Sequence, residues 1–459
     1  MIRKNILLLL MTLLSNQNAS AQKLPSTLLW RISGNSLQNP SYLYGTMHLT
    51  DERIFNLGDS LYSALEKSEG FATEIDPSEF TSLLINETKK SLKNKILLKD
   101  FLSPEKFKKY GKLLADKLKK DENKITTSDI LDEKNKWSNE SLKNGKMKTF
   151  LDMYLYDIAR RKGKWTSGVE DPQDQGDLED PVTEEDIEQI ARYKNYEEFT
   201  REQNEEGNFF INAYINNDLN MIDSISNLSD TLSNDVMLVR RNIKMAARMD
   251  SMSHIRSTVF AIGAAHLPGK KGLIELLREK GFSVTPVFSS KKIKPSDYKV
   301  EEIAVRWYNT KDEDSLYTAE MPGIAGDMTF YGIMKMKMFY DAFSSTVYMT
   351  SALTSPLPKN KVDSVLNSMA KEFFSTEESP KGKPITIDNV SGLEYESTSG
   401  SYSRGYMLYE NGKIFMALAK SQKEDTSAAG DIRRFLHSFS INKIRPVEEK
   451  NFYYVNKTK

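Results

Sequence analysis

The sequence STVFAIGAAHLPGKKGLIELLREKGFSVTPVF, at residues 257–288, predicts two β-strands joined by a helix. The apolar run at 257–265 is typical of a buried strand, and His266 stands directly after it. Pro268 and Gly269 open the helical segment, and Gly281 is the expected C-cap that ends it. A second strand follows at 282–288. Strand, helix and strand within about thirty residues form a parallel crossover unit.

Three more strands are expected earlier in the chain. Residues 28–33 (LLWRIS) and 42–49 (YLYGTMHL) are apolar, and the turn-forming residues between them predict a hairpin. Residues 71–75 (FATEI) read as a short buried strand that Asp76 and Pro77 end. Added to the crossover unit, these strands predict a mixed sheet.

A long helical insertion separates these strands. Residues 80–148 are rich in lysine and carry apolar residues at helical spacing, and residues 149–161 form a clearer amphipathic helix. The acidic segment at 170–188 lacks the spacing of a calcium loop, so we interpret it as a charged loop capping a helix that starts near Thr183. Further helices are expected up to residue 252. The fold class is therefore α/β (α+β).

A second α+β domain is expected after a linker at 291–297. Helical runs at 363–374 and 428–436 alternate with short strands, and Asn411 and Gly412 predict a hairpin turn. The MKMKM sequence at 334–338 is typical of a half-buried strand rather than of a metal-binding methionine set. We find no catalytic constellation here and expect a binding or scaffolding role. The predicted domains are residues 22–290 and 298–459.

The N-terminus has the three parts of a secretory signal. Arg3 and Lys4 form a basic head, an apolar run covers residues 6–14, and Ala19-Ser20-Ala21 precedes Gln22. No later segment is apolar enough to span a bilayer. We therefore expect a signal peptide at residues 1–21 and an exported protein, periplasmic or secreted, with no stable membrane span after signal removal.

Composition excludes several classes of protein. The 64 Lys and Arg residues balance the 64 Asp and Glu residues, which gives no case for a nucleic-acid partner. Because the chain has no cysteine, it has neither disulfides nor a cysteine nucleophile nor thiolate zinc sites. Neutral net charge leaves the oligomeric state open.

Two of the four histidines end predicted strands in the same way. Gly45-Thr46-Met47-His48 and Gly263-Ala264-Ala265-His266 share the pattern GxxH, and Glu74 lies near the end of a third strand. Ligands bind beyond the carboxyl ends of strands in open α/β sheets. Two imidazoles and a carboxylate suit a divalent metal that activates water, or metal-free acid–base chemistry. The other two histidines, His254 and His437, are interpreted as structural or exposed.

Several segments resemble the TraB/PrgY/GumN family over residues 27–290. The order of the matching motifs agrees with the family throughout, although the zinc protease motif HExxH is absent. The matching segments are LLWRIS and SYLYGTMHL within 28–49, FATEID at 71–76, LDMYLYDIARRKGK at 151–164, GVEDPQDQ at 168–175, RRNIKMAARM at 240–249 and the segment at 260–287.

This resemblance implies a chemistry, because the family is similar to the Tiki proteins, metal-dependent peptidases with paired GxxH motifs. It is also distantly similar to erythromycin-esterase hydrolases. Carried over by position, His48 and His266 would be metal ligands, or one ligand and one base, with Glu74 as their carboxylate partner. The ion would be divalent: manganese, cobalt or zinc. Glu74 would also serve catalysis, with Glu170, Arg241 and Asn242 facing the same site. Arg240 is the alternative to Arg241, since the two are adjacent.

Three functions remain open on this sequence. The first is an exported, metal-dependent hydrolase acting on a peptide or protein substrate. The second is a non-catalytic envelope protein that binds a peptide or a partner. The third is a metal-free, esterase-like hydrolase with a histidine base. The C-terminal part, with residues 391–421 followed by RRFLHSFSI at 433–441, faintly resembles PsbP-type modules of exported proteins.

Overall fold

The computed structural model covers most of the chain, which folds into two compact units. Unit 1 takes the described residues within 1–76, 150–176 and 201–301, and unit 2 takes those within 77–149, 177–200 and 302–459. The expected signal peptide, residues 1–21, lies outside the described part. The described residues are 23–93, 96–144, 147, 149–172, 182–195, 198, 208–229, 232–300, 305–330, 334–374, 382–398, 402–421 and 429–442.

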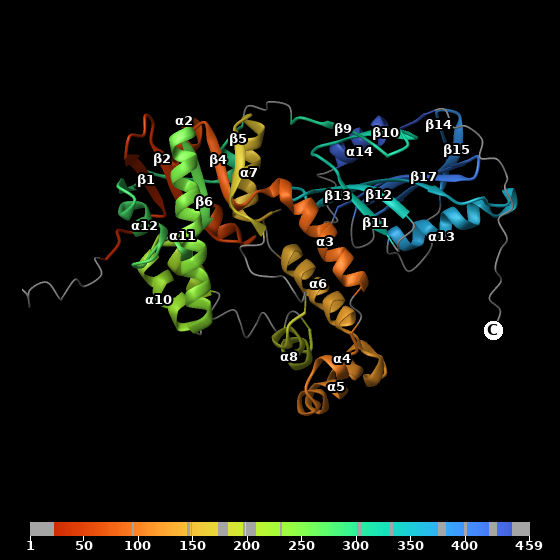
Figure 1. The fold of residues 1–459 in the computed structure, drawn as a ribbon, viewed down its shortest axis with the longest axis horizontal. Coiled ribbons are helices and arrows are strands. Elements are labelled where there is room, and N and C mark those ends of the chain that lie inside the picture. The colour runs from red at the N-terminus through yellow and green to blue at the C-terminus, as the bar shows by residue number, and fades with distance from the viewer. Residues whose placement is uncertain are drawn as a thin grey trace, which may run out of the picture. The chain divides into compact units, whose positions relative to one another are not determined.

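Unit 1 is built on a six-stranded mixed sheet with the order β5-β4-β6-β2-β1-β7 (Figure 1). The first four strands in this order run parallel, whereas β1 is antiparallel to both β2 and β7. The predicted hairpin is thus β1 and β2, and β6 and β7 form the predicted crossover. The strands are β1 (Leu29–Gly34), β2 (Ser41–Thr46), β4 (Gly70–Ile75), β5 (Trp165–Glu170), β6 (Thr258–Gly263) and β7 (Phe282–Val287).

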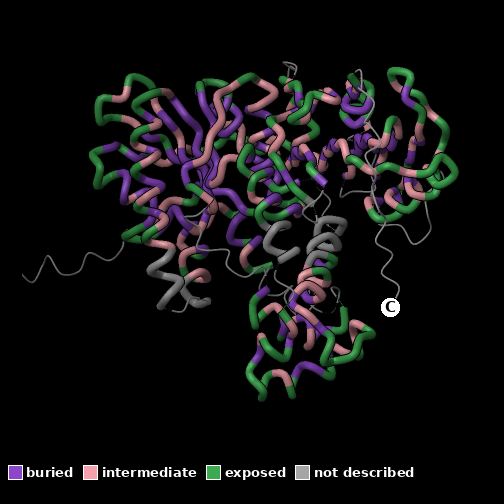
Figure 2. The backbone as a smooth tube through the Cα atoms, turned by 45° about the vertical axis from the view of Figure 1, so that its right-hand side comes forward, coloured by how far each residue is buried: buried purple, intermediate pink, exposed green. Residues whose placement is uncertain are grey.

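Helices cover this sheet. Helix α7 packs on β4 and β5, α11 packs on β5 and on α12, and α12 packs on β7. Buried residues fill the central strands, as expected for parallel strands covered on both faces (Figure 2). The remaining elements of the unit are η1 (Glu52–Phe55), β3 (Leu57–Gly58), α2 (Asp59–Lys67), α7 (Leu151–Arg161), α10 (Leu219–Ser229), α11 (Leu232–Ile255), η5 (Ala264–His266), α12 (Leu273–Glu279), β8 (Lys292–Ile293) and η6 (Pro295–Asp297).

Unit 2 contains a seven-stranded antiparallel sheet, β11-β12-β13-β17-β16-β15-β14, and a three-stranded sheet, β18-β10-β9. Asn411 and Gly412 have positive φ between β16 and β17, which is the predicted hairpin turn. The strands are β9 (Tyr308–Lys311), β10 (Tyr317–Met321), β11 (Gly326–Phe330), β12 (Met334–Asp341), β13 (Thr346–Thr354), β14 (Lys383–Ile387), β15 (Val390–Ser397), β16 (Ser403–Glu410), β17 (Lys413–Ser421) and β18 (Ser440–Ile441).

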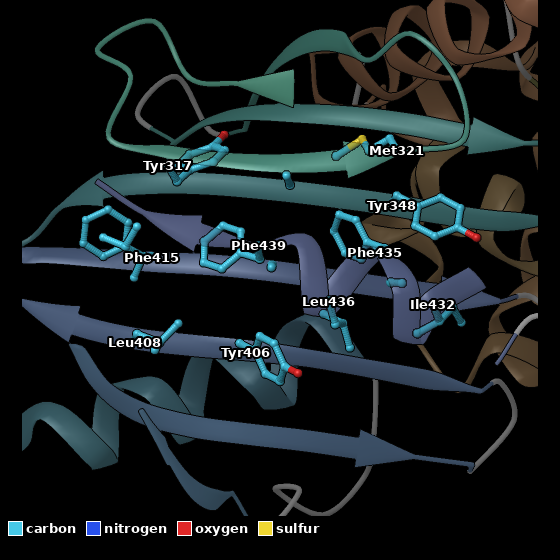
Figure 3. Packing of buried hydrophobic residues seen from close by; sticks show 14 of the residues in the cluster. Tyr317, Met321, Tyr348, Tyr406, Leu408, Phe415, Ile432, Phe435, Leu436 and Phe439 are labelled. Carbon is cyan, nitrogen blue, oxygen red and sulfur yellow. The ribbon is translucent and has the colours of Figure 1, made fainter. Parts of the chain in front are cut away.

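Two hydrophobic clusters form around the larger sheet. One gathers Tyr348 and Phe415 with residues of α14 (Ala429–Ser438), among them Phe435 (Figure 3). The other includes methionines of β11 and β12 together with Leu366 of α13 (Val362–Phe374). Along β12 buried methionines alternate with less buried lysines, which confirms the half-buried strand predicted for MKMKM.

The helical insertion divides between the two units. Helix α3 (Phe80–Lys93) packs on β11 and β12, and Thr81 Oγ1 accepts a hydrogen bond of 3.0 Å from the Tyr340 N–H. Thr183 forms a capping box with Asp186 at the start of α8, where the sequence predicted a capped helix. The other helices of unit 2 are η2 (Pro77–Glu79), α4 (Leu98–Phe101), α5 (Pro104–Leu118), η3 (Glu122–Lys124), α6 (Thr127–Asn144), α8 (Glu184–Arg192) and η7 (Lys359–Lys361).

The domain boundaries drawn from the sequence stay a prediction. The expected linker at 291–297 carries β8, which pairs with β3 in unit 1. None of the helices in the described ranges is long and apolar enough to cross a membrane.

Candidate functional site

The site lies at the carboxyl edge of the parallel strands in unit 1. His48 follows the end of β2, Glu74 stands near the end of β4, Glu170 closes β5, and His266 lies in η5 directly after β6. The strand order β5-β4-β6-β2 places these four ends side by side. The structure therefore brings together the two GxxH histidines and Glu74, as the sequence predicted.

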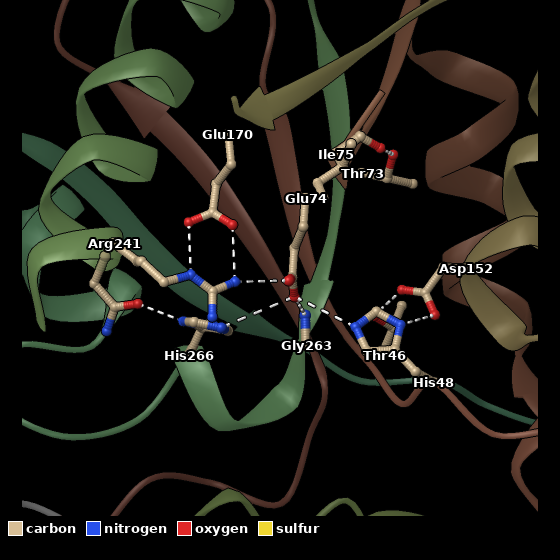
Figure 4. A network of polar contacts seen from close by, with 11 residues as sticks. Thr46, His48, Thr73, Glu74, Ile75, Asp152, Glu170, Arg241, Gly263 and His266 are labelled. Carbon is tan, nitrogen blue, oxygen red and sulfur yellow. Dashed lines mark hydrogen bonds and ion pairs between the residues drawn. The ribbon is translucent and has the colours of Figure 1, made fainter. Parts of the chain in front are cut away.

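Glu74 is the centre of this group (Figure 4). Its Oε1 lies 3.7 Å from Nε2 of His48 and 4.0 Å from Nε2 of His266. The backbone N–H of Gly263 donates to the same oxygen at 2.6 Å. Burial of Glu74, which is 8% exposed, opposes ionisation, but the interactions with His48 and His266 and the hydrogen bond from the Gly263 N–H outweigh it and lower the pKa of Glu74 to about 2. Glu74 is thus a carboxylate at neutral pH.

His48 is held from its other side by α7. Its Nδ1 lies 2.8 Å from Oδ2 of Asp152, and Oδ1 of Asp152 accepts a hydrogen bond from the hydroxyl of Thr46. The hydrogen bond to Asp152, followed by the close contact with the Glu74 carboxylate, raises the pKa of His48 to about 11. The His48 side chain is 58% exposed, so it is the accessible member of the group.

His266 is buried and held in one tautomer. Nδ2 of Asn242 donates to the Lys271 carbonyl at 2.9 Å, which turns the amide oxygen of Asn242 toward Nδ1 of His266, 2.6 Å away. Nδ1 of His266 therefore carries the proton, and Nε2 presents a lone pair toward Glu74. Burial lowers the pKa of His266, which favours this neutral form.

Arg241 links the two acidic strand ends. Its Nε and one terminal nitrogen form a bidentate pair with Glu170, at 2.9 and 2.8 Å, and the same terminal nitrogen lies 3.2 Å from Oε2 of Glu74. The Glu170 hydrogen bonds raise the pKa of Arg241, so its positive charge is permanent. The alternative, Arg240, is exposed. Arg241 thus contacts Glu74, and Asn242 contacts His266.

Asp152 is the residue that the sequence analysis missed. It lies on the buried side of α7 with Leu155 and Ala159, so an acidic residue in the apolar stripe of an amphipathic helix was the available signal. The remaining histidines lie away from the site. His254 is exposed and bonds to the carbonyls of Asp250 and Asn35, and His437 is exposed on α14.

The donor set fits a divalent metal in type and orientation. Both imidazoles turn Nε2 toward Glu74, while each Nδ1 is held by an outer partner, Asp152 or Asn242. This is the usual support of metal-bound histidines. The N···O separations of 3.7 and 4.0 Å exceed the roughly 3.4 Å expected between two ligands of one tetrahedral zinc ion. Accordingly, no three His, Asp or Glu side chains in the described ranges are already spaced as metal ligands. Binding of one ion by all three groups would require both imidazoles to move closer to Glu74.

Comparisons with known proteins found one family and several solved structures. The sequence model of the TraB/PrgY/gumN family matches residues 28–286. Among solved structures, the chain is similar to the solution structure of cyanobacterial PsbP (CyanoP) from Synechocystis sp. PCC 6803, with 12% identity over 30% of this chain and 94% of that chain, and a TM-score of 0.23.

A crystal structure from Bacteroides thetaiotaomicron VPI-5482 is also similar, with 9% identity over 31% of this chain and 50% of that chain, and a TM-score of 0.21. The chain thus covers half the length of this second structure. No curated protein matches the chain.

Proposed function

The chain belongs to the TraB/PrgY/gumN family, and from this membership together with the site geometry we propose that it is a metal-dependent hydrolase of peptide bonds. One observation carries the proposal. Nε2 of His48 and Nε2 of His266 both approach Oε1 of Glu74, while each Nδ1 is occupied by an outer partner. Such a set serves metal binding better than it serves packing, because the Nε2 lone pair of neutral His266 otherwise faces a carboxylate oxygen.

His48, His266 and Glu74 would hold the ion, for which manganese, cobalt and zinc are the candidates. When bound, a divalent ion supplies a Lewis acid and a water of lowered pKa. Glu74 suits the part of an anionic ligand, because a carboxylate with a pKa of about 2 is a weak proton acceptor at neutral pH. Asp152 and Asn242 orient the two imidazoles.

Arg241 is suited to stabilise the negative charge that develops on the carbonyl oxygen during hydrolysis. Its Nε and one terminal nitrogen donate hydrogen bonds to Glu170 and Glu74. Its other terminal nitrogen makes no hydrogen bond to any described residue. A fixed cation of this kind stabilises an oxyanion without reorganising during the reaction. The bidentate pair with Glu170 keeps the guanidinium in place.

Elemental analysis tests this function. The mature protein is incubated with manganese, cobalt and zinc, freed of unbound metal, and compared with the His48→Ala/His266→Ala variant. We expect about one ion per wild-type chain, none in the folded variant, and peptide-bond hydrolysis that chelation abolishes. Histidine-dependent hydrolysis that survives chelation supports the metal-free esterase-like hydrolase instead. If the protein retains no metal and hydrolyses no peptide, the result supports the non-catalytic binding protein.

We also propose export to the periplasm or the medium, on the strength of the signal-like segment at residues 1–21. Expression of the full chain followed by mass spectrometry of the exported product tests it. Cleavage after Ala21 is the expected result, and a cell-retained chain that keeps this segment contradicts it.

A further inference from the structure

A cavity separate from the histidine site lies in unit 1 beside β2. Its volume is about 400 Å³, and Tyr44 of β2 and Tyr214 form part of its wall. Leu28 and Leu61 give it apolar surface. Phe288, which is 63% exposed, lies at its boundary. The function proposed above assigns no role to this cavity, which we name the Tyr44 cavity.

The Tyr44 cavity is connected to the histidine site through β2. Tyr214 Oη donates to the carbonyl of Gly45 at 2.8 Å, and the next residue, Thr46, donates to the Asp152 carboxylate that holds His48. Only four peptide units separate Tyr44 from His48, so their Cα atoms lie within about 15 Å. An extended peptide covers that distance in roughly four or five residues. A bound peptide of that length is therefore long enough to extend from His48 to the cavity.

The lining of the Tyr44 cavity is positively charged. It contains Arg53, Lys291 and Lys292 and has neither Asp nor Glu among its residues. Of these cations, Arg53 pairs with Asp51 at 2.6 Å, outside the lining. Asp59, next to the lining residue Gly58, accepts hydrogen bonds from Ser290. The side chains of the lining itself thus carry only positive charge.

Lys292 is the cation best placed to bind a ligand. Its ammonium group donates to the Ile215 carbonyl at 2.9 Å, which holds the side chain against the cavity wall. No carboxylate in the described part of the chain pairs with it. An ammonium group has three donors, so two remain for a ligand.

We propose that the Tyr44 cavity is a subsite for an acidic side chain of the substrate, a Glu or Asp within about four residues of the bond cleaved at His48. This inference rests on the proposed function, because it takes a peptide as the ligand. The apolar wall packs against the methylene groups of the side chain, and Lys292 together with Lys291 pairs with its carboxylate. The protein therefore selects acidic peptides.

Calorimetric binding of matched peptides to the full chain tests the proposal. The probes are N-acetyl, C-amidated alanine pentapeptides that carry a single Glu or, in its place, Gln. One charge-assisted pair is expected to make the Glu peptide bind roughly 10-fold more tightly. A third probe, alanine pentapeptide with a free carboxyl end, distinguishes a terminal carboxylate from a side chain. We expect it to bind more weakly than the Glu peptide.

Variants assign the preference to the cavity. Lys292→Gln should remove most of the preference for Glu, Lys292→Arg should retain it, and Lys67→Gln, an exposed lysine of α2, should leave it unchanged. Because Lys292 also bonds to Ile215, a melting curve checks that each variant is folded. The salt dependence of binding gives a second measure in the unaltered protein. Rising ionic strength should weaken the binding of the Glu peptide and leave that of the Gln peptide unchanged.

Equal binding of the Glu and Gln peptides overturns the proposal, and so does a preference that Lys292→Gln leaves intact. Binding of neither peptide overturns it as well. All titrations are repeated with the His48→Ala/His266→Ala variant, where the preference should persist. A preference for Glu without any hydrolysis therefore contradicts the proposed catalysis alone, and hydrolysis without a preference contradicts the subsite alone.

Discussion

The backbone N–H of Gly263 donates a 2.6 Å hydrogen bond to Oε1 of Glu74, so the first residue of one GxxH motif holds the carboxylate that both histidines approach. A Cβ atom at Gly263 would lie 2.8 Å from that same oxygen. The glycine of this motif is therefore required for close approach and not for an unusual backbone conformation.

Gly263→Ala should displace the Glu74 carboxylate. Misplacing a catalytic group by about 1 Å can reduce turnover roughly 100-fold, and we expect a loss of that order in metal-dependent hydrolysis, with lower metal content. Gly430→Ala is the matched control, because a Cβ there meets nothing within 4 Å. Unchanged metal content and activity in folded Gly263→Ala would contradict the role given to this contact.

Asp152→Asn should weaken the hold on His48 without removing a hydrogen-bonding group. Outer partners of metal-bound histidines are worth roughly 10- to 100-fold in metal affinity or activity, and we expect a loss in that range. The pKa of His48, raised to about 11 mainly by Asp152, should fall in the metal-free variant. An NMR titration of the His48 ring measures this. A His48 pKa that does not change in the variant would show that Asp152 is not the cause.

Stability of the metal-free protein should depend on pH through His48. Its pKa is raised from 6.5 to about 11, so its stabilising contribution is complete below pH 6.5 and is lost as the pH rises toward 11. The free energy of unfolding, measured with denaturant, should therefore be lower at pH 10 than at pH 7. This difference should be smaller in His48→Gln. The opposite sign applies to Glu74, whose contribution is lost as the pH falls from 4.5 toward 2.

Arg241→Gln should destabilise the fold as well as abolish activity. The variant removes the bidentate hydrogen bonds from Arg241 to the Glu170 carboxylate, which is buried at 4% residue exposure. Breaking such a buried pair costs about 3–5 kcal/mol in the free energy of unfolding. Arg434→Gln, whose partner Glu320 is half exposed, should cost less than about 1 kcal/mol. Equal losses in the two variants, measured by urea unfolding, would count against the ion pair as a structural element.

Local sequence patterns were sufficient to predict five of the six strands of the unit 1 sheet, all except β5, and to place His48, Glu74 and His266 at strand ends. The carboxyl ends of parallel strands meet at one edge of a sheet, so a residue's place at the end of its strand also gives its place in the site. The predicted metal and catalytic roles of these residues remain proposals. Only the family resemblance pointed to Glu170, Arg241 and Asn242.

Two features could not be predicted from local pattern. Asp152 meets His48 across 104 residues, because of how α7 docks on the sheet. Helix α3 follows β4 directly in sequence yet packs on β11 and β12 through residues such as Ile85. In both cases tertiary packing determines which residues the helix contacts. The helical spacing of apolar residues predicts that a helix packs on a sheet, but not on which sheet it packs.

The place of β6 in the sheet has a consequence for biosynthesis. Strand β6 lies between β4 and β2, yet Gly263 leaves the ribosome 189 residues after Glu74. Until then the nascent chain presents unpaired strand edges, which invite association with other chains. The sheet closes only when its latest segments arrive, and pairing over such long separations is slow. The growing polypeptide is therefore exposed to such association until β6 has been made, and the contacts of His48, Glu74 and His266 can form only after that point.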